Sequence, residues 1–238
     1  ETGQGITDKH LMHLDKLSKI EKSGKPFFFY TQYAHIHNKL VEDVGKKIGD
    51  FDEAFFSPKN NNIERYNTYV LETENYVKAL LGKISELSLD SSSLIIFHSD
   101  HGVSLGEKSG EKMYGSYLFD YTLKSFMLFM GPQISPKIFQ TQVSQIDIMP
   151  TVLDYLGIPI SNNHFPLRGE SLLCFQDMDE NTPINGKIVF SETGGLGGPW
   201  PSPEYHNLFC VRSNQRKVIY NATEGKYSYY NLLEDAEE

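Results

Sequence analysis

The sequence predicts an α/β fold, in which a mostly parallel sheet with flanking helices is followed by a small antiparallel subdomain. Apolar runs without polar alternation are typical of strands buried on both faces, and they occur at 26–33, 94–98 and 125–130. Segments with helical periodicity alternate with these runs, at 7–21, 63–87 and 146–156. Near the end, short strand-like segments parted by Gly, Asn and Ser indicate an antiparallel meander, at 187–191, 207–212, 217–220 and 227–230.

This change of pattern divides the chain into an incomplete α/β core at 1–186 and an antiparallel β subdomain at 187–238. Apolar residues recur at three-residue spacing in the first helix, from Leu11 to Ile20, and Gly24 and Pro26 follow its end. Residues 38–62 carry charges, Gly, Pro and consecutive Asn residues, so we expect a loop there.

Composition limits the classes of function. With 22 basic and 31 acidic residues the net charge is −9, which disfavours nucleic-acid binding because that needs clustered Lys and Arg. The sequence has no run of about 18 apolar residues that could span a membrane. Its two cysteines, Cys174 and Cys210, form no C-x-x-C pair. Cellular location and oligomeric state stay open.

The motif Ser99-Asp100-His101-Gly102 follows the apolar run 94–98 directly. Ligands of open α/β sheets bind beyond the carboxyl ends of strands. Asp100 and His101 could give a divalent cation one oxygen and one nitrogen ligand there, while Gly102 lets the backbone turn away. The alternative is an ordinary turn in which both side chains only satisfy backbone groups.

Several segments in order along the chain make the sequence similar to the sulfatases, within the alkaline phosphatase superfamily. Residues 26–37 resemble the family's PFFLYLSFHAPH, and Leu105-Gly106-Glu107 follows the Ser99–Gly102 motif. Further segments resemble the family's LYEETLRVP, SHIDLMPTLLDLAGI, LDGRSLLP and LYDLENDPEE, at 118–124, 143–158, 167–173 and 229–238. The resemblance implies an alkaline phosphatase-like fold that is incomplete at its N-terminal side.

The resemblance also implies roles for particular residues. Asp100 and His101 would bind the active-site metal, and His101 would also contact substrate. His37 would bind the substrate at its ester oxygen and assist the leaving alcohol, because an imidazole can donate a proton near neutral pH. Lys112 would hold the sulfate oxygens as a point charge, with Lys108 as its competitor. For His37 and Lys112 the alternative is a solvated side chain.

Calcium is the metal that the resemblance favours, with Mg²⁺, Mn²⁺ or Zn²⁺ as alternatives because a His beside the Asp is unusual for calcium. The family's nucleophile is a formylglycine made from the cysteine of a C-x-P-x-R motif. Neither Cys174 nor Cys210 lies in such a motif. We therefore expect a C-terminal portion of a hydrolase of small-molecule or glycan sulfate esters, inactive by itself.

Other functions stay open from the sequence alone. The phosphatase or phosphotransferase branch of the superfamily would use Ser or Thr as its nucleophile, and a non-catalytic sulfatase-like module would only bind a ligand. Gly102-Val103-Ser104-Leu105-Gly106 also matches the G-x-S-x-G pattern of serine hydrolases, in which Ser104 would be the nucleophile.

Overall fold

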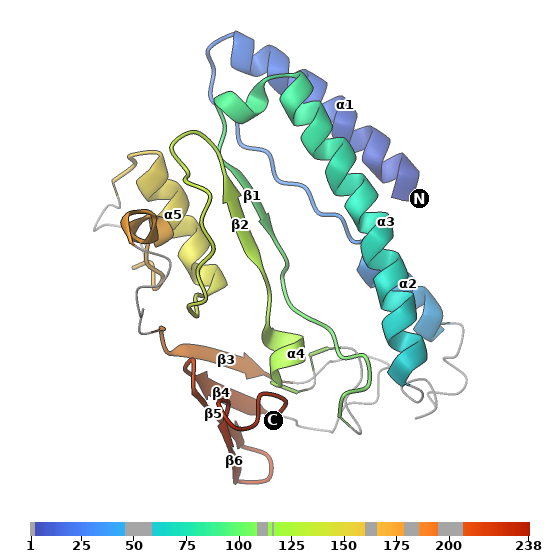
Figure 1. Cartoon of the computed structure of the whole chain (residues 1–238), viewed down its shortest axis with the longest axis vertical. Helices are drawn as coiled ribbons and strands as arrows, with labels where there is room; N and C mark the ends of the chain where they lie inside the picture. Colours follow the sequence, from blue (N-terminus) through green and yellow to red (C-terminus); the bar gives the residue numbers. More distant parts are fainter. Residues whose placement is uncertain are drawn as a thin grey trace. The chain divides into compact units, whose positions relative to one another are not determined.

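The computed structural model (Figure 1) describes residues 3–45, 59–108, 114–115, 117–159, 166–178, 186–194 and 207–238. The chain forms two compact units. The first comprises Glu1–Ile95, Leu105–Lys112 and Met130–Pro132, and the second Ile96–Ser104, Met113–Phe129 and Gln133–Glu238. No helix within the described ranges is long and apolar enough to cross a membrane.

The first unit is built mainly from three helices: α1 (Gly3–Lys22), α2 (His35–Gly45) and α3 (Lys59–Glu86). Both α1 and α2 pack against α3. Their shared core contains Leu14 and Leu17 of α1 with Tyr76, Leu80 and Ile84 of α3, all buried. Spacings of three and four residues put these side chains on one face of each helix. The predicted helices at 7–21 and 63–87 are confirmed.

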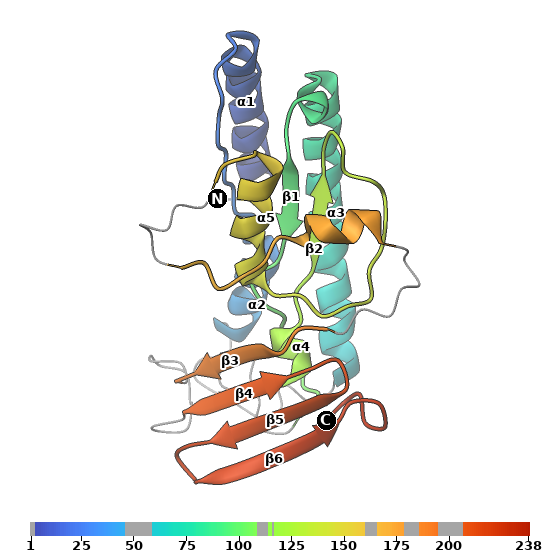
Figure 2. The same ribbon diagram turned by 90° about the vertical axis from the view of Figure 1, so that its left-hand side faces the viewer.

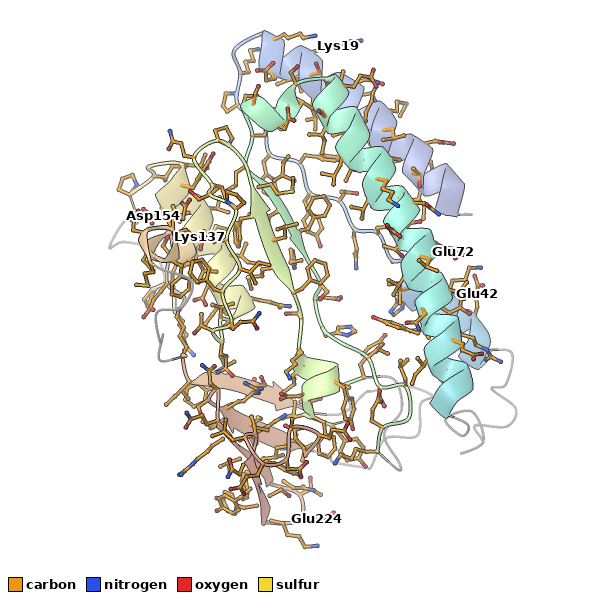
Figure 3. The ribbon with its side chains drawn as sticks, viewed as in Figure 1. Lys19, Glu42, Glu72, Lys137, Asp154 and Glu224 are labelled. Atoms are coloured by element: carbon orange, nitrogen blue, oxygen red, sulfur yellow. The ribbon has the colours of Figure 1, made fainter. Side chains whose placement is uncertain are left out.

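The loop predicted at 38–62 is wrong at both ends, because α2 extends to Gly45 and α3 begins at Lys59. Residues 46–58 lie outside the described ranges. The polar side chains that suggested a loop are compatible with helices, since these helices present one face to water. Glu42 on α2, labelled in Figure 3, is such a residue, with 56% of its side chain exposed.

The strand predicted at 26–33 is also wrong. This segment connects α1 and α2 without regular secondary structure, and Phe28 and Tyr30 are exposed. It is held by side chains instead: Tyr33 stacks on Tyr76 with ring centroids 3.8 Å apart. A strand requires a neighbouring strand to receive its backbone hydrogen bonds, and no strand in the described part of the chain pairs with this segment.

Strands β1 (Ile95–His98) and β2 (Met127–Met130) pair with each other, as the apolar runs at 94–98 and 125–130 predicted. Figure 2 shows their arrows pointing in opposite directions. Just beyond them, Ser99 N donates to Phe126 O at 3.3 Å. The expected mostly parallel sheet is therefore not confirmed. Apolar character predicts that a strand is buried, but it carries no information on the direction of its neighbour.

The second unit contains a four-stranded sheet in the order β3-β4-β5-β6 (Figure 2), with every neighbouring pair antiparallel. Its strands are Val189–Thr193, Leu208–Arg212, Arg216–Asn221 and Lys226–Asn231. The predicted meander is confirmed. Because side chains alternate between the faces of a strand, Leu208, Cys210 and Ile219 share one face. They form a buried cluster with Leu118.

Ion pairs at this buried face connect the sheet to the short helix α4 (Asp120–Leu123). Arg212 donates to both carboxylate oxygens of Asp120, with Nη2 2.5 Å from Oδ2. Lys217, whose side chain is fully buried, lies 2.9 Å from Asp120 Oδ1 and 2.7 Å from Glu238 Oε1. Glu238 Oε2 accepts the Asp120 backbone N–H at 2.9 Å. We call Asp120, Arg212, Lys217 and Glu238 the Asp120 cluster.

A second buried carboxylate, that of Asp147, lies at the end of the 3₁₀ turn Gln145–Asp147, directly before helix α5 (Ile148–Tyr155). Asp147 is completely buried. Its carboxylate accepts from Ser144 N at 2.9 Å, from Glu170 N at 2.8 Å and from Lys187 Nζ at 2.7 Å. The helix predicted at 146–156 is confirmed, and its start is fixed by this capping interaction.

The Asp120 cluster predicts a measurable contribution to stability. Burial alone would raise the pKa of Asp120, but the hydrogen bonds from Arg212 and the charge of Lys217 outweigh it and hold the pKa well below its ordinary value. Asp120→Asn removes the carboxylate that pairs with Arg212 and leaves Glu238 as the remaining partner of Lys217, so we expect the free energy of unfolding to fall by about 3–5 kcal/mol. Chemical denaturation at pH 7 measures this loss.

The pH dependence follows from the lowered pKa. The contribution of Asp120 is complete above its unfolded pKa of about 4 and is lost as the pH falls toward the folded pKa. Stability of the native protein should therefore decline more between pH 5 and 3 than that of Asp120→Asn.

Glu224→Gln is the control for the loss of stability in Asp120→Asn, because Glu224 (Figure 3) forms an exposed ion pair with Lys226 that is worth about 0–1 kcal/mol. Equal losses in the two variants would refute a special role for the cluster.

Candidate active site

The motif at 99–102 forms a turn directly after β1, as predicted. Gly102 N donates to Thr122 O of α4 at 3.0 Å. A Cβ on Gly102 would lie 2.2 Å from Tyr121 O and 3.0 Å from Lys124 O. Only glycine lets the backbone approach these carbonyl groups so closely. The glycine of the motif is thus explained by packing of the turn against α4.

Asp100 presents its carboxylate to solvent, with 71% of its side chain exposed. Oδ1 accepts the backbone N–H of His101 at 3.0 Å, and Oδ2 lies 3.7 Å from His101 Nε2. Two adjacent side chains at the end of a strand therefore direct an oxygen and a nitrogen toward one another. A cation could contact both groups, but binding of a metal by Asp100 and His101 stays a prediction.

The hydrogen bonds of His101 define which of its nitrogens can bind a cation. Nδ1 lies 2.6 Å from Gly102 O. A carbonyl oxygen can only accept, so Nδ1 carries the hydrogen and the lone pair of the neutral ring is on Nε2. Metal-binding histidines commonly have one nitrogen held by a backbone carbonyl in this way. The ring also contacts that of Tyr114, with centroids 4.2 Å apart.

The pKa of the Tyr114 hydroxyl reflects the charge of the neighbouring Asp100. Burial raises the pKa of its hydroxyl above the ordinary value, and the negative charge of Asp100 raises it further. The neighbourhood of Asp100 is therefore one in which a second negative charge is disfavoured and a positive charge is favoured.

Two donors are fewer than a divalent cation normally gathers, because protein sites usually supply three or more. Among the described residues, no group of three or more His, Cys, Asp or Glu side chains could hold a metal. Asp100 and His101 fit one side of a cation by their chemistry. The remaining ligands would be further side chains, backbone carbonyl oxygens or water molecules.

The other residues proposed from the sequence belong to the first unit. His37 lies in the first turn of α2 and is exposed, while its neighbour His35 is paired with Glu72 of α3 (Figure 3). Lys112 lies outside the described residues, and Lys108, its competitor, is half-buried. A common cleft of His37 and Lys112 with Asp100 and His101 stays a prediction.

Sequence reasoning missed one residue at this turn. Gln145 donates its side-chain amide to the carbonyl oxygens of Ser99 and Asp100. An isolated glutamine more than forty residues from the motif carries no signal that would connect it to the turn. Its position becomes apparent only from the packing of the segment before α5.

Comparison with known proteins shows the family to which the chain belongs. The family model described as Sulfatase matches residues 6–158, which is more than half of the chain, and the chain belongs to this family. It is 28% identical over 204 residues to arylsulfatase K of Bos taurus, an alignment that covers 82% of this chain and 33% of the relative. It is also 27% identical over 177 residues to choline-sulfatase of Rhizobium meliloti, which covers 73% and 32%. The chain thus spans about a third of the length of these relatives.

The fold is shared with solved structures of the family. One is a protein of a Bacteroides thetaiotaomicron genetic locus for the metabolism of multiple glycosaminoglycans. It matches with a TM-score of 0.66 at 17% identity, covering 97% of this chain and 52% of that protein. At this level of identity the match demonstrates a common fold.

The serine hydrolase alternative is disfavoured by the burial of its nucleophile. Ser104 is only 2% exposed, whereas the serine of a G-x-S-x-G elbow has to present its hydroxyl at the top of a strand-to-helix turn. No helix follows Ser104 among the residues described up to 108.

The close contact at Gly102 yields a test of the turn. In Gly102→Ala the new methyl group would overlap with Tyr121 O, so we expect stability to fall by about 1–3 kcal/mol as the turn moves away from α4. Gly82→Ala is the matched control: Gly82 lies within α3 with open space around it, and alanine there should stabilise by about 0.5–1 kcal/mol. Thermal unfolding of both variants measures the difference. A Gly102→Ala variant as stable as the native protein would contradict the described turn.

Proposed function

We propose that this chain is part of a metal-dependent hydrolase of sulfate esters and that Asp100 and His101 form the metal side of its active site. The observation that carries the proposal is the Asp100–His101 pair at the end of β1, in a chain that belongs to the sulfatase family. The names of the relatives fit this activity, as arylsulfatase and choline-sulfatase both act on sulfate esters.

The proposed role of each residue follows from its chemistry. A bound divalent cation, for which calcium is the first candidate, would polarise the sulfate group as a Lewis acid. Asp100 would hold it through a carboxylate oxygen and His101 through Nε2, which its bond to Gly102 O leaves unprotonated. Lys112 would contact the sulfate oxygens. His37 would hydrogen-bond the ester oxygen and donate a proton to the leaving alcohol.

We propose that neither cysteine of this sequence is the nucleophile. Burial raises the pKa of the Cys210 thiol to about 11, and it is enclosed in the sheet, so it forms little thiolate near neutral pH. Cys174 is exposed in the 3₁₀ turn Leu172–Asp177, where its Sγ donates to Ser171 O at 3.4 Å. A formylglycine elsewhere in the whole protein is the nucleophile that the family resemblance implies.

Two donors alone would bind a divalent cation weakly. We therefore infer that the 238-residue chain by itself has little or no turnover. Its substrate class, a small-molecule or glycan sulfate ester, belongs to the same proposal. The phosphatase branch and a binding module without catalysis are the alternatives that the following experiments separate.

The first experiment measures hydrolysis of 4-nitrophenyl sulfate and 4-nitrophenyl phosphate by the protein expressed from its complete gene. The sulfate ester should be the better substrate. Asp100→Asn should lower kcat/KM by at least about a hundredfold, because removing one electrostatic group from an active site typically costs that much. The 238-residue chain, assayed in parallel, should show no enzyme-like rate.

Two variants serve as controls for this experiment. Asp154→Asn changes an exposed carboxylate of α5 that accepts a hydrogen bond from Ser171 Oγ (Figure 3), and it should keep nearly native activity. Ser104→Ala should do the same. Preference for the phosphate ester would favour the phosphatase branch, loss of activity in Ser104→Ala would revive the serine hydrolase, and full activity in Asp100→Asn would refute the proposed site.

The second experiment tests His37 as the proton donor to the leaving alcohol. A poor leaving group needs this proton, whereas 4-nitrophenolate hardly does. His37→Gln should therefore reduce hydrolysis of an alkyl sulfate by about 10²–10⁴-fold and that of 4-nitrophenyl sulfate much less. His13→Gln, a substitution of an exposed histidine of α1, is the control. Equal losses for both substrates would exclude His37 as the acid.

A further inference from the structure

We infer that Gln145 is a positioning residue for the metal side of the site: its amide fixes the backbone on both sides of the Asp100 Cα and so orients the Asp100 carboxylate. This inference rests on the proposed function, because it assumes that Asp100 holds a cation. Gln145 would itself touch neither the cation nor the substrate.

The contacts of Gln145 converge on the turn. Its Nε2 lies 2.7 Å from Ser99 O and donates also to Asp100 O, while Ser125 Oγ lies 3.3 Å away. The amide has two hydrogens, which the two carbonyl oxygens accept. These carbonyls belong to the peptide groups before and after the Asp100 Cα. Holding both fixes the backbone torsions of Asp100, and with them the direction in which its side chain leaves the chain.

The backbone that carries Gln145 is itself fixed. Gln145 lies between Ser144 and Asp147, the two residues of the capping box before α5. The buried Asp147 carboxylate is held by Lys187 Nζ at 2.7 Å and by two backbone N–H groups. Because the backbone at Gln145 is rigidly held, its side chain can keep the Asp100 backbone in one position.

Two further hydrogen bonds, at Ser99 and at Gly102, also hold the turn. Ser99 Oγ accepts the Phe126 N–H at 3.3 Å, and Gly102 N donates to Thr122 O at 3.0 Å. These bonds secure the residues before and after the Asp100–His101 pair. Gln145 adds hydrogen bonds to the peptide groups on both sides of the Asp100 Cα. The Asp100 side chain is 71% exposed and therefore accessible to a ligand.

The experiment measures Ca²⁺ binding by calorimetry in the protein expressed from its complete gene, together with the Ca²⁺ concentration that gives half-maximal activity. Gln145→Met keeps the length of the side chain but removes both donors, and we expect the Kd for Ca²⁺ to rise about 10–100-fold. Gln145→Glu should be at least as damaging, because it turns a carboxylate toward two carbonyl oxygens. Gln145→His restores an N–H donor and should recover part of the affinity.

Gln142→Met is a matched control. Gln142, three residues earlier, also donates its amide to two backbone carbonyls, those of Lys187 and Arg212, and accepts from the Arg212 guanidinium, so its substitution removes packing contacts of the sheet and none of the hydrogen bonds to Ser99 O and Asp100 O. It should lower the melting temperature without changing the Kd for Ca²⁺. Asp100→Asn serves as the positive control, with Ca²⁺ binding lost.

Each outcome has one interpretation. Native Ca²⁺ affinity in Gln145→Met, with binding lost in Asp100→Asn, overturns the inference and leaves the proposed function intact. Equal losses of affinity in Gln145→Met and Gln142→Met would assign Gln145 a structural role only and also overturn it. Unchanged binding in Asp100→Asn would overturn the proposed site together with the inference.

Discussion

The buried carboxylate of Asp120 is the constraint on which the second unit depends. It joins Arg212 and Lys217 of the antiparallel sheet to the first residue of α4. The Thr122 carbonyl of α4 then accepts the Gly102 N–H, and Tyr121 O of the same helix lies close to the Gly102 Cα. Since Lys217 is fully buried, it has to be paired, and Asp120 and Glu238 provide its two carboxylate partners. A residue far from the motif thereby helps to define where the Asp100–His101 turn lies.

Fixing the Asp100–His101 turn in this way would favour the binding of a ligand. Freedom of movement that a binding group loses on contact with its ligand reduces the affinity. Hydrogen bonds to the backbone on both sides of Asp100 remove part of that freedom in advance. The proposed function assigns a divalent cation to the turn, and the contacts within the second unit describe how the turn is held in place.

Much of the fold could be predicted from the sequence, and the errors have a common cause. Short strand-like segments parted by Gly, Asn and Ser marked the meander, and the Leu14 and Leu17 spacing marked α1, because both patterns are local. The segment around Phe28 was predicted to be a strand because it is apolar, but a strand also needs a partner, which a local pattern cannot reveal. The direction of β2 relative to β1 was likewise not encoded in either apolar run.

The candidate site divides in the same way. Asp100, His101 and Gly102 could be found because the strand and the motif are contiguous in sequence. Gln145 and the contribution of Asp120 to the turn could not, because they act through contacts between distant segments. The division of the chain at residue 187 stays a prediction, and so do the roles of Asp100, His101, His37 and Lys112.

The most direct test of the central claim is a crystal structure of the protein expressed from its complete gene. The crystals would contain Mn²⁺, and the position of the ion would be found from its anomalous scattering. We expect an Mn²⁺ peak at a coordination distance of about 2.0–2.6 Å from the Asp100 carboxylate, with the His37 imidazole facing the same cleft. A peak held by other residues, with Asp100 free of metal, would contradict the account. So would His37 on the opposite side of the sheet.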